Sequence, residues 1–160
     1  MDSIHPNSRI ADLVGLLYVL ANTFKGKTDL YQLEKEMEVD LDDLMPIVYS
    51  ADLLGFVTIG EGDIVITDVG LEFIKSSLRR RKEIIRNAII RVEPFATAVK
   101  LEKFTLETLM DELRKKGVKI FDTPSGLYDL EVTLTEWGVY SGLLVKEEEN
   151  YMVTNYMKPL

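Results

Sequence analysis

The chain has 160 residues, of which 46% are hydrophobic and 29% are charged, as in a folded globular protein. It contains no cysteine and a single histidine, which excludes disulfides, thiolate metal sites and cysteine nucleophiles. The net charge of −8 disfavours nucleic acid and anionic membranes as partners. The sequence shows no signal-peptide pattern and no apolar run of about 18 residues, so we expect a cytoplasmic protein with no membrane insertion.

Apolar residues repeat with helical spacing in three segments near the start of the chain. The first predicted helix covers residues 8–24. A short helix over 29–38 follows, with Thr28 as its N-cap, and a third helix over 41–54 has Asp40 as its N-cap. Three helices close together in the sequence predict a small helical domain.

A β-hairpin is predicted directly after the third helix. Two β-branched runs, 56–59 and 64–67, flank a turn rich in glycine and acidic residues. The order helix, helix, helix, hairpin is typical of a winged-helix unit. A long helix is then predicted over 71–92, where apolar residues recur every seven positions; packing along its own chain is favoured over a coiled coil.

The last third of the chain resembles the first. Ser141–Leu144 matches Leu54–Val57, and Asn150–Thr154 matches Asp63–Thr67 at the same offset of 87 residues, although two generic hairpins could also match by chance. We therefore expect a mainly α fold with small β-hairpins (α+β), built from two winged-helix-like halves joined by a long helix. The predicted divisions are an N-terminal winged-helix domain over 1–70, a connecting helix over 71–92 and a C-terminal winged-helix-like domain over 93–160.

No motif predicts a catalytic residue, a metal site or a cofactor. Residues 21–28 resemble a phosphate-binding loop, but a predicted helix precedes them where a strand is needed, so an interhelical turn is favoured. Residues 40–43 fail as a calcium loop because Met45 and Ala51 stand where glycine and glutamate are required. His5 has no orienting carboxylate in sight, which favours a packing or capping role.

The distribution of charge argues against DNA binding by the predicted groove-facing helices. No lysine or arginine occurs from Glu36 to Ile74, and the same is true from Ile120 to Val145. Since DNA affinity comes mainly from cations that replace counterions, an acidic helix would be repelled. The segment 36–74 instead carries a second apolar stripe, the candidate partner-binding residues Met45, Pro46, Tyr49 and Leu53. Such a stripe suggests contact with protein, or packing within the chain.

Basic residues concentrate in the predicted long helix, where seven cations and two anions give residues 71–91 a charge of +5. The candidate patch for an anionic partner or nucleic acid consists of Lys75, Arg79, Arg80, Arg81, Lys82 and Arg86. A solvated face that pairs with the acidic hairpins of its own chain or of a second copy in a homodimer is favoured. Docking of an acidic protein, and binding of phosphate backbone or anionic lipid, remain open.

Several segments together resemble the C-terminal AAA-associated domain family, which accompanies the ATP-binding subunits of nitrate/sulfonate/taurine-type ABC transporters. They are His5-Pro6, Arg9, Leu13–Leu17, Asp29–Leu33, Asp42–Val48, Leu53–Phe56, Glu61–Thr67 and the Trp-Gly-x-Tyr feature at Trp137–Tyr140. The resemblance covers nearly the whole chain, and we expect a stand-alone copy of the domain. It implies a non-enzymatic accessory or regulatory module that contacts a transporter ATPase. The alternative function is a winged-helix DNA-binding transcriptional regulator that uses the basic helix 75–91.

Overall fold

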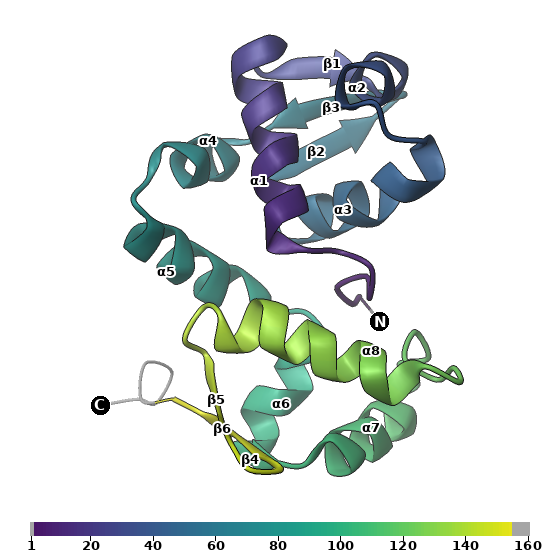
Figure 1. Ribbon diagram of the computed structural model, residues 1–160, viewed down its shortest axis with the longest axis vertical. Coiled ribbons are helices and arrows are strands. Elements are labelled where there is room, and N and C mark those ends of the chain that lie inside the picture. The colour runs from purple at the N-terminus through teal and green to yellow at the C-terminus, as the bar shows by residue number, and fades with distance from the viewer. Residues whose placement is uncertain (1, 155–160) are drawn as a thin grey trace. The chain divides into compact units, whose positions relative to one another are not determined.

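A computed structural model describes residues 2–154 of the chain (Figure 1). The contacts divide it into two compact units, the N-terminal unit of residues 7–81 and the C-terminal unit of residues 82–154 together with 2–6. Helices dominate both units, and each unit contains one small three-stranded antiparallel sheet. The predicted fold class, mainly α with small β-hairpins, is confirmed.

The N-terminal unit follows the predicted order of three helices and a hairpin. Its elements are α1 (Ile10–Tyr18) with a π-helical extension η1 (Val19–Thr23), β1 (Lys27–Asp29), α2 (Leu30–Met37), α3 (Leu41–Leu53), β2 (Val57–Gly60), β3 (Asp63–Ile66) and α4 (Asp68–Lys75). The sheet has the order β1-β3-β2. Fully buried leucines of α1 pack in the core with Leu33, Val48 and Phe56, because the helical repeat places these apolar side chains on one face.

The predicted interhelical turn over residues 21–28 is wrong in detail. Its first residues lie in η1, and Thr28 lies in β1, opposite Ile64 of β3. The N-cap of α2 is instead Asp29, whose side chain accepts a hydrogen bond from the Gln32 amide (2.7 Å). Asp40 is the N-cap of α3 as predicted but makes no capping bond there; the Leu41 amide donates to the Glu34 carboxylate (2.5 Å).

The predicted long helix over 71–92 is wrong, because two serines divide it. Ser76 adopts an extended conformation after α4, and its hydroxyl donates to the Glu72 carbonyl (2.6 Å). The Ser77 hydroxyl accepts a hydrogen bond from the Arg80 amide (3.2 Å) at the start of α5 (Leu78–Ile89). Serine side chains compete for backbone hydrogen bonds in this way. Here this competition ends the helix, although apolar residues recur every seven positions across the break.

The C-terminal unit repeats the helix, strand, helix, helix, strand, strand order of the N-terminal unit, although one further helix precedes this order and the π-helical segment follows its third helix instead of its first. After α5 come α6 (Phe95–Leu101), β4 (Lys103–Phe104), α7 (Leu106–Lys115), α8 (Gly126–Thr133) with the π-helical η2 (Leu134–Val139), β5 (Leu144–Glu147) and β6 (Asn150–Val153). The strand order β4-β6-β5 repeats β1-β3-β2. β5 and β6 begin 87 residues after β2 and β3, respectively.

Hydrogen bonds at the ends of the two hairpins also repeat at this offset. The Thr67 hydroxyl donates to the Gly55 carbonyl (2.6 Å), and the Thr154 hydroxyl donates to the Gly142 carbonyl (2.7 Å). Equivalent bonds at equivalent positions show that the two hairpins form a structural repeat rather than a chance similarity.

The first residues of the chain complete the C-terminal unit, although the sequence analysis assigned them to the N-terminal domain. Ser3 forms a parallel β-bridge with Glu93, and the Ile4 amide donates to the Glu93 carbonyl (2.9 Å). The Ile4 side chain is fully buried. The pairing that holds these first residues joins backbone groups 90 residues apart, and no local sequence pattern predicts such a contact.

A buried polar cluster, the Glu93 cluster, anchors the start of α6. The Glu93 carboxylate is 2% exposed and accepts hydrogen bonds from the Thr97 amide (2.9 Å), the Thr97 hydroxyl (2.9 Å) and the Lys116 ammonium (2.7 Å). A buried carboxylate is tolerated only when it is paired and hydrogen-bonded in this way. The cluster therefore ties α6 to the end of α7.

The Trp137-Gly138 pair has a structural role in the same unit. Trp137 is fully buried. A Cβ atom at Gly138 would lie 2.7 Å from Leu144 and 2.8 Å from Phe95, closer than carbon atoms can pack. Glycine therefore allows η2 to approach these two side chains.

Candidate functional site

The predicted partner-binding residues lie on the outer side of α3. We define the α3 surface as Leu41, Met45, Pro46, Tyr49 and Leu53. Tyr49 is 59% and Leu41 40% exposed, and the other three are half-buried. The opposite side of α3 is buried in the core of the N-terminal unit. The sequence pattern thus identified an apolar stripe with exposed members, and it missed Leu41.

Polar contacts on the inner side hold α3 in place. The Ser8 hydroxyl lies 2.6 Å from the Ser50 hydroxyl and donates to the Pro46 carbonyl (3.1 Å). Both serines are 1% exposed. Because buried hydroxyls with partners restrict motion, the α3 surface is presented on a rigid element.

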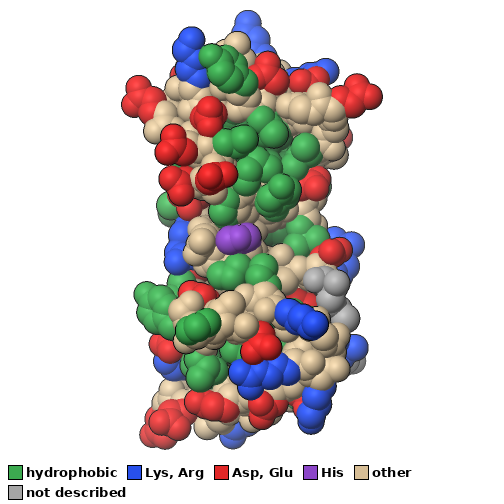
Figure 2. Space-filling view, turned by 90° about the vertical axis from the view of Figure 1, so that its right-hand side faces the viewer, with side chains coloured by type: hydrophobic (Ala, Val, Ile, Leu, Met, Phe, Trp, Pro, Cys, Tyr) green, Lys and Arg blue, Asp and Glu red, His purple; other side chains and the backbone are tan. Residues whose placement is uncertain are grey.

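Carboxylates flank the α3 surface. Asp42, Asp43 and Asp52 lie on the same helix and are exposed. In Figure 2 hydrophobic side chains gather on the displayed face of the N-terminal unit, with acidic side chains around them. An exposed apolar area with a charged rim is the pattern of a protein-contact surface.

The basic residues predicted as a patch are largely engaged within the chain. In the N-terminal unit, Lys75 and Arg79 are exposed, whereas Arg80 forms an ion pair with Glu72 (2.8 Å). The Arg81 guanidinium donates to the carbonyls of Phe73 (3.0 Å) and Ile74 (2.8 Å) at the end of α4. Arg81 therefore caps carbonyl groups that a helix end leaves without partners.

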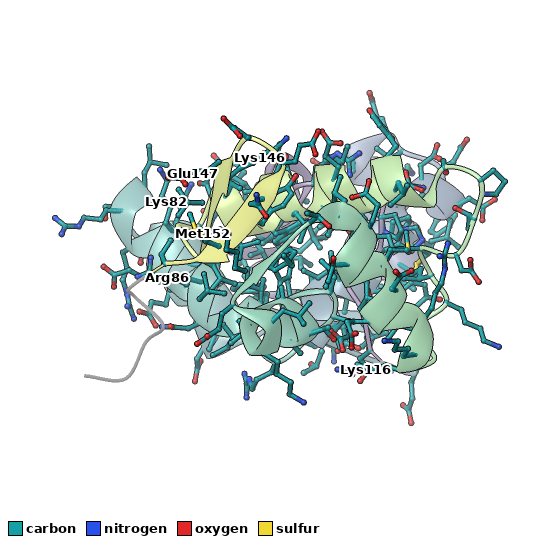
Figure 3. The ribbon with its side chains drawn as sticks, turned by 90° about the horizontal axis from the view of Figure 1, so that it is seen from below. Lys82, Arg86, Lys116, Lys146, Glu147 and Met152 are labelled. Carbon is teal, nitrogen blue, oxygen red and sulfur yellow. The ribbon has the colours of Figure 1, made fainter. Side chains whose placement is uncertain are left out.

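Lys82 and Arg86, the two residues of the predicted patch that lie in the C-terminal unit, also have partners within the chain (Figure 3). The Lys82 ammonium lies 5.2 Å from the centre of the Tyr140 ring, and the Arg86 guanidinium donates to the Ser141 carbonyl (3.0 Å). The contacts of the basic residues are thus with Glu72, backbone carbonyls and aromatic rings. The acidic partner among these contacts is Glu72 of α4, whereas acidic hairpins were predicted as the partners.

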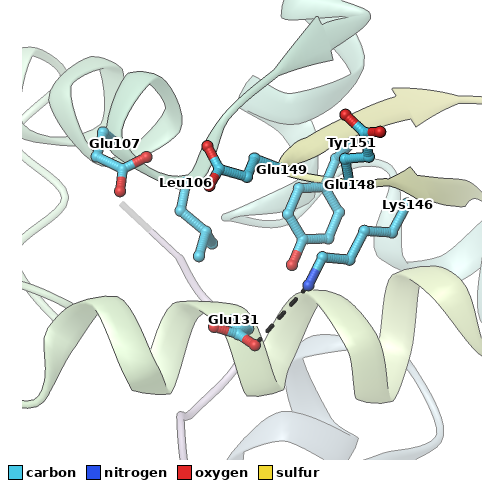
Figure 4. Close-up of a pocket in the computed structure, with 7 residues that line it drawn as sticks. All are labelled: Leu106, Glu107, Glu131, Lys146, Glu148, Glu149 and Tyr151. Atoms are coloured by element: carbon cyan, nitrogen blue, oxygen red, sulfur yellow. Dashed lines mark ion pairs between the residues drawn. The ribbon is translucent and has the colours of Figure 1, made fainter.

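A pocket of about 220 Å³ in the C-terminal unit was not predicted (Figure 4). It is lined by Leu106, Glu107, Glu131, Lys146, Glu148, Glu149 and Tyr151. From the sequence this hairpin was predicted as part of the repeat, with residues 147–149 as a solvated tip. The one available signal was Tyr151, a buried tyrosine at the position where the first hairpin has Ile64.

Burial shifts the pKa values of Tyr151 and His5. Burial raises the pKa of Tyr151, opposed by the nearby Lys146 ammonium, so the hydroxyl is neutral at pH 7. Burial lowers the pKa of His5, which keeps its imidazole neutral at pH 7.

In residues 2–154 no group of three or more histidine, cysteine or acidic side chains is placed to hold a metal ion. No helix in the same residues is long and apolar enough to span a membrane.

Comparison with known families gives one match. The model of the C-terminal AAA-associated domain matches residues 31–147, from the start of α2 to the end of β5. This span includes the α3 surface and all the basic residues discussed above. No curated protein and no solved structure matches the chain. The family match covers well over half of the sequence and confirms the resemblance, and the chain therefore belongs to the C-terminal AAA-associated domain family.

Proposed function

We propose that this protein is a non-enzymatic accessory module that regulates an ABC transporter by binding its ATP-binding subunit through the α3 surface. Family membership supports an accessory role linked to AAA-type proteins. The observation that carries the proposal is the α3 surface itself, on which Tyr49 is 59% exposed. Such a partner places the protein in the cytoplasm, where ATP is available.

The chemistry of the α3 surface specifies the partner's binding face. Tyr49 and Leu41 offer apolar area, and Asp42, Asp43 and Asp52 surround it with negative charge. A complementary face has an apolar depression with lysine or arginine at its edge. Exposed tyrosine is a frequent anchor in such contacts, because its large ring loses little conformational entropy on binding.

DNA binding by the basic residues is the competing function. The winged-helix order of both units favours it, but Arg80, Arg81 and Arg86 already hold intramolecular partners. We expect no shift of a duplex in a gel assay at low salt, where phosphate contacts are strongest. A shift that disappears when Lys75 and Arg79 are both replaced by glutamine would establish the DNA-binding function instead.

The test of the proposed function is binding of the purified ATP-binding subunit to the protein and to its Tyr49→Asp variant. A charge at the centre of an apolar contact costs about 2 kcal/mol or more, so we expect an affinity loss of about 30-fold by calorimetry. Tyr31→Asp is the matched control, because Tyr31 is 69% exposed on α2. The control should bind like the unchanged protein.

Two results would contradict the proposal. One is equal binding by the Tyr49→Asp and Tyr31→Asp variants. The other is sedimentation of the unchanged protein as a dimer that Tyr49→Asp dissociates, which would assign the α3 surface to a second copy of the chain.

A further inference from the structure

The pocket in the C-terminal unit has an excess of negative charge. The start of α7 contributes Glu107, α8 contributes Glu131, and the turn between β5 and β6 contributes Glu148 and Glu149. Lys146 supplies the only cation among the lining residues. Four carboxylates and one ammonium among the lining residues give the pocket a negative potential that attracts a further positive charge. This site lies apart from the α3 surface and does not depend on the function proposed for that surface.

The Tyr151 hydroxyl is an independent sign of a ligand. Its side chain is fully buried, yet its oxygen makes no hydrogen bond of normal geometry within residues 2–154. The side chains of Lys146 and Thr135 lie close enough to lower its pKa without completing such a bond. Figure 4 shows the hydroxyl directed toward the Lys146 ammonium and Glu131 in the pocket. A buried hydroxyl without a partner is unfavourable, so a group that hydrogen-bonds to it gains affinity.

The repeat shows that the fold does not require this hydroxyl. In the first hairpin the residue pair Ile59 and Ile64 lies face to face, and at the same register of the second hairpin Lys146 lies opposite Tyr151. Ile64 and Tyr151 are both fully buried. Two hydrocarbon side chains are enough to pack these positions in the first hairpin. The second hairpin has an ammonium and an unpaired hydroxyl at the equivalent positions.

Lys146 holds its place only loosely. Its ammonium lies 4.0 Å from the Glu131 carboxylate, beyond the roughly 2.7–2.9 Å of a charged hydrogen bond. It lies 5.6 Å from the centre of the Tyr151 ring. The ammonium therefore lies close enough to Tyr151 to lower its pKa, but it makes no hydrogen bond of normal geometry to the hydroxyl or to Glu131, and a better-placed cation can replace it.

We propose that this pocket binds a primary ammonium or guanidinium group on a short alkyl stem. The cation pairs with Glu131 in place of Lys146 and donates a hydrogen bond to the Tyr151 oxygen, while the stem lies against Leu106. The volume of about 220 Å³ is below the roughly 300–1,000 Å³ of drug-sized sites, which suits a single side chain or a small amine. A free amine and a lysine or arginine side chain of another protein share this chemistry.

The test is a titration of the full chain followed by amide NMR signals of β5 and β6. The probes are n-butylammonium, N-acetyl-arginine amide and, as an anion of similar size, butyrate. We expect saturable shifts with a cationic probe and none with butyrate. Tyr151→Phe and Glu131→Gln should each weaken binding by about tenfold, the loss of one hydrogen bond or charge. Lys146→Met should tighten it by removing the internal competitor.

The control is Glu61→Gln, at the hairpin position equivalent to Glu148, which should leave binding unchanged. Tyr151→Phe removes only an unpaired hydroxyl, and its circular dichroism should match that of the unchanged protein. Binding of butylammonium alone assigns an ammonium group as the ligand, and binding of the arginine amide alone assigns a guanidinium group. The proposal is overturned if neither cation binds or if butyrate binds. It is also overturned if the Tyr151→Phe variant binds the cation as well as the unchanged chain, or if Lys146→Met abolishes cation binding.

Discussion

Replacing Trp137 by alanine is expected to lower the free energy of unfolding by about 3–5 kcal/mol. Trp137 is fully buried at the centre of η2, where Gly138 brings the helix against Phe95 and Leu144. Removing the indole leaves a cavity in a close-packed core, which costs both the transfer free energy of the ring and the contacts around it. Urea denaturation followed by far-UV circular dichroism measures the loss.

Tyr128 provides the control for this experiment. It lies on α8, in the same helical segment as Trp137, and is 68% exposed. Tyr128→Ala should change the free energy of unfolding by no more than about 0.5 kcal/mol. Equal losses for the two substitutions would show that the indole is not part of the core.

Replacing Glu93 by alanine is the second substitution with a large expected effect, a loss of about 3–5 kcal/mol. The carboxylate is 2% exposed and holds both Thr97 and Lys116. Its removal leaves the Thr97 amide at the start of α6 without its acceptor, and the Lys116 ammonium, 29% exposed, keeps the Thr97 hydroxyl (2.8 Å) but loses its carboxylate partner. The loss therefore comes mainly from the groups left unpaired.

A double-mutant cycle separates that cause from simple loss of packing. Adding Lys116→Met to Glu93→Ala removes the unpaired charge, so the double variant should be more stable than Glu93→Ala alone. Glu112→Ala is the control, because its ion pair with Lys115 (3.2 Å) is exposed and is worth at most about 1 kcal/mol. Additive losses at Glu93 and Lys116 would contradict the coupling.

Local patterns predicted the helices and hairpins because those elements depend on residues close in the sequence. Spacing of apolar residues predicted α1 and α3, and a turn between β-branched runs predicted β2 and β3. The strands β1 and β4 were missed because they have three and two residues, respectively, too few for a pattern. Their partners are distant in the sequence, as for Lys27 opposite Val65.

The two surfaces differ in how far the sequence could predict them. The α3 surface was predicted because Tyr49 lies on a second apolar face of one helix, where a core requires only the first. The pocket was missed because its residues extend from Leu106 to Tyr151 and meet only when α7, α8 and the hairpin pack together. In the sequence, Tyr151 has the pattern of an ordinary core residue. Comparison with Ile64 at the equivalent position shows an added hydroxyl, and only the structure shows that this hydroxyl lacks a hydrogen-bond partner.

The most direct test of the central claim is photo-crosslinking in cells that express the full chain with p-benzoyl-phenylalanine in place of Tyr49. Tyr31, exposed on α2, carries the same probe in the control chain. Mass spectrometry of the adducts should identify the ATP-binding subunit of an ABC transporter from position 49 and not from position 31. Adducts that contain only a second copy of the chain, or the same proteins from both positions, would contradict the proposal.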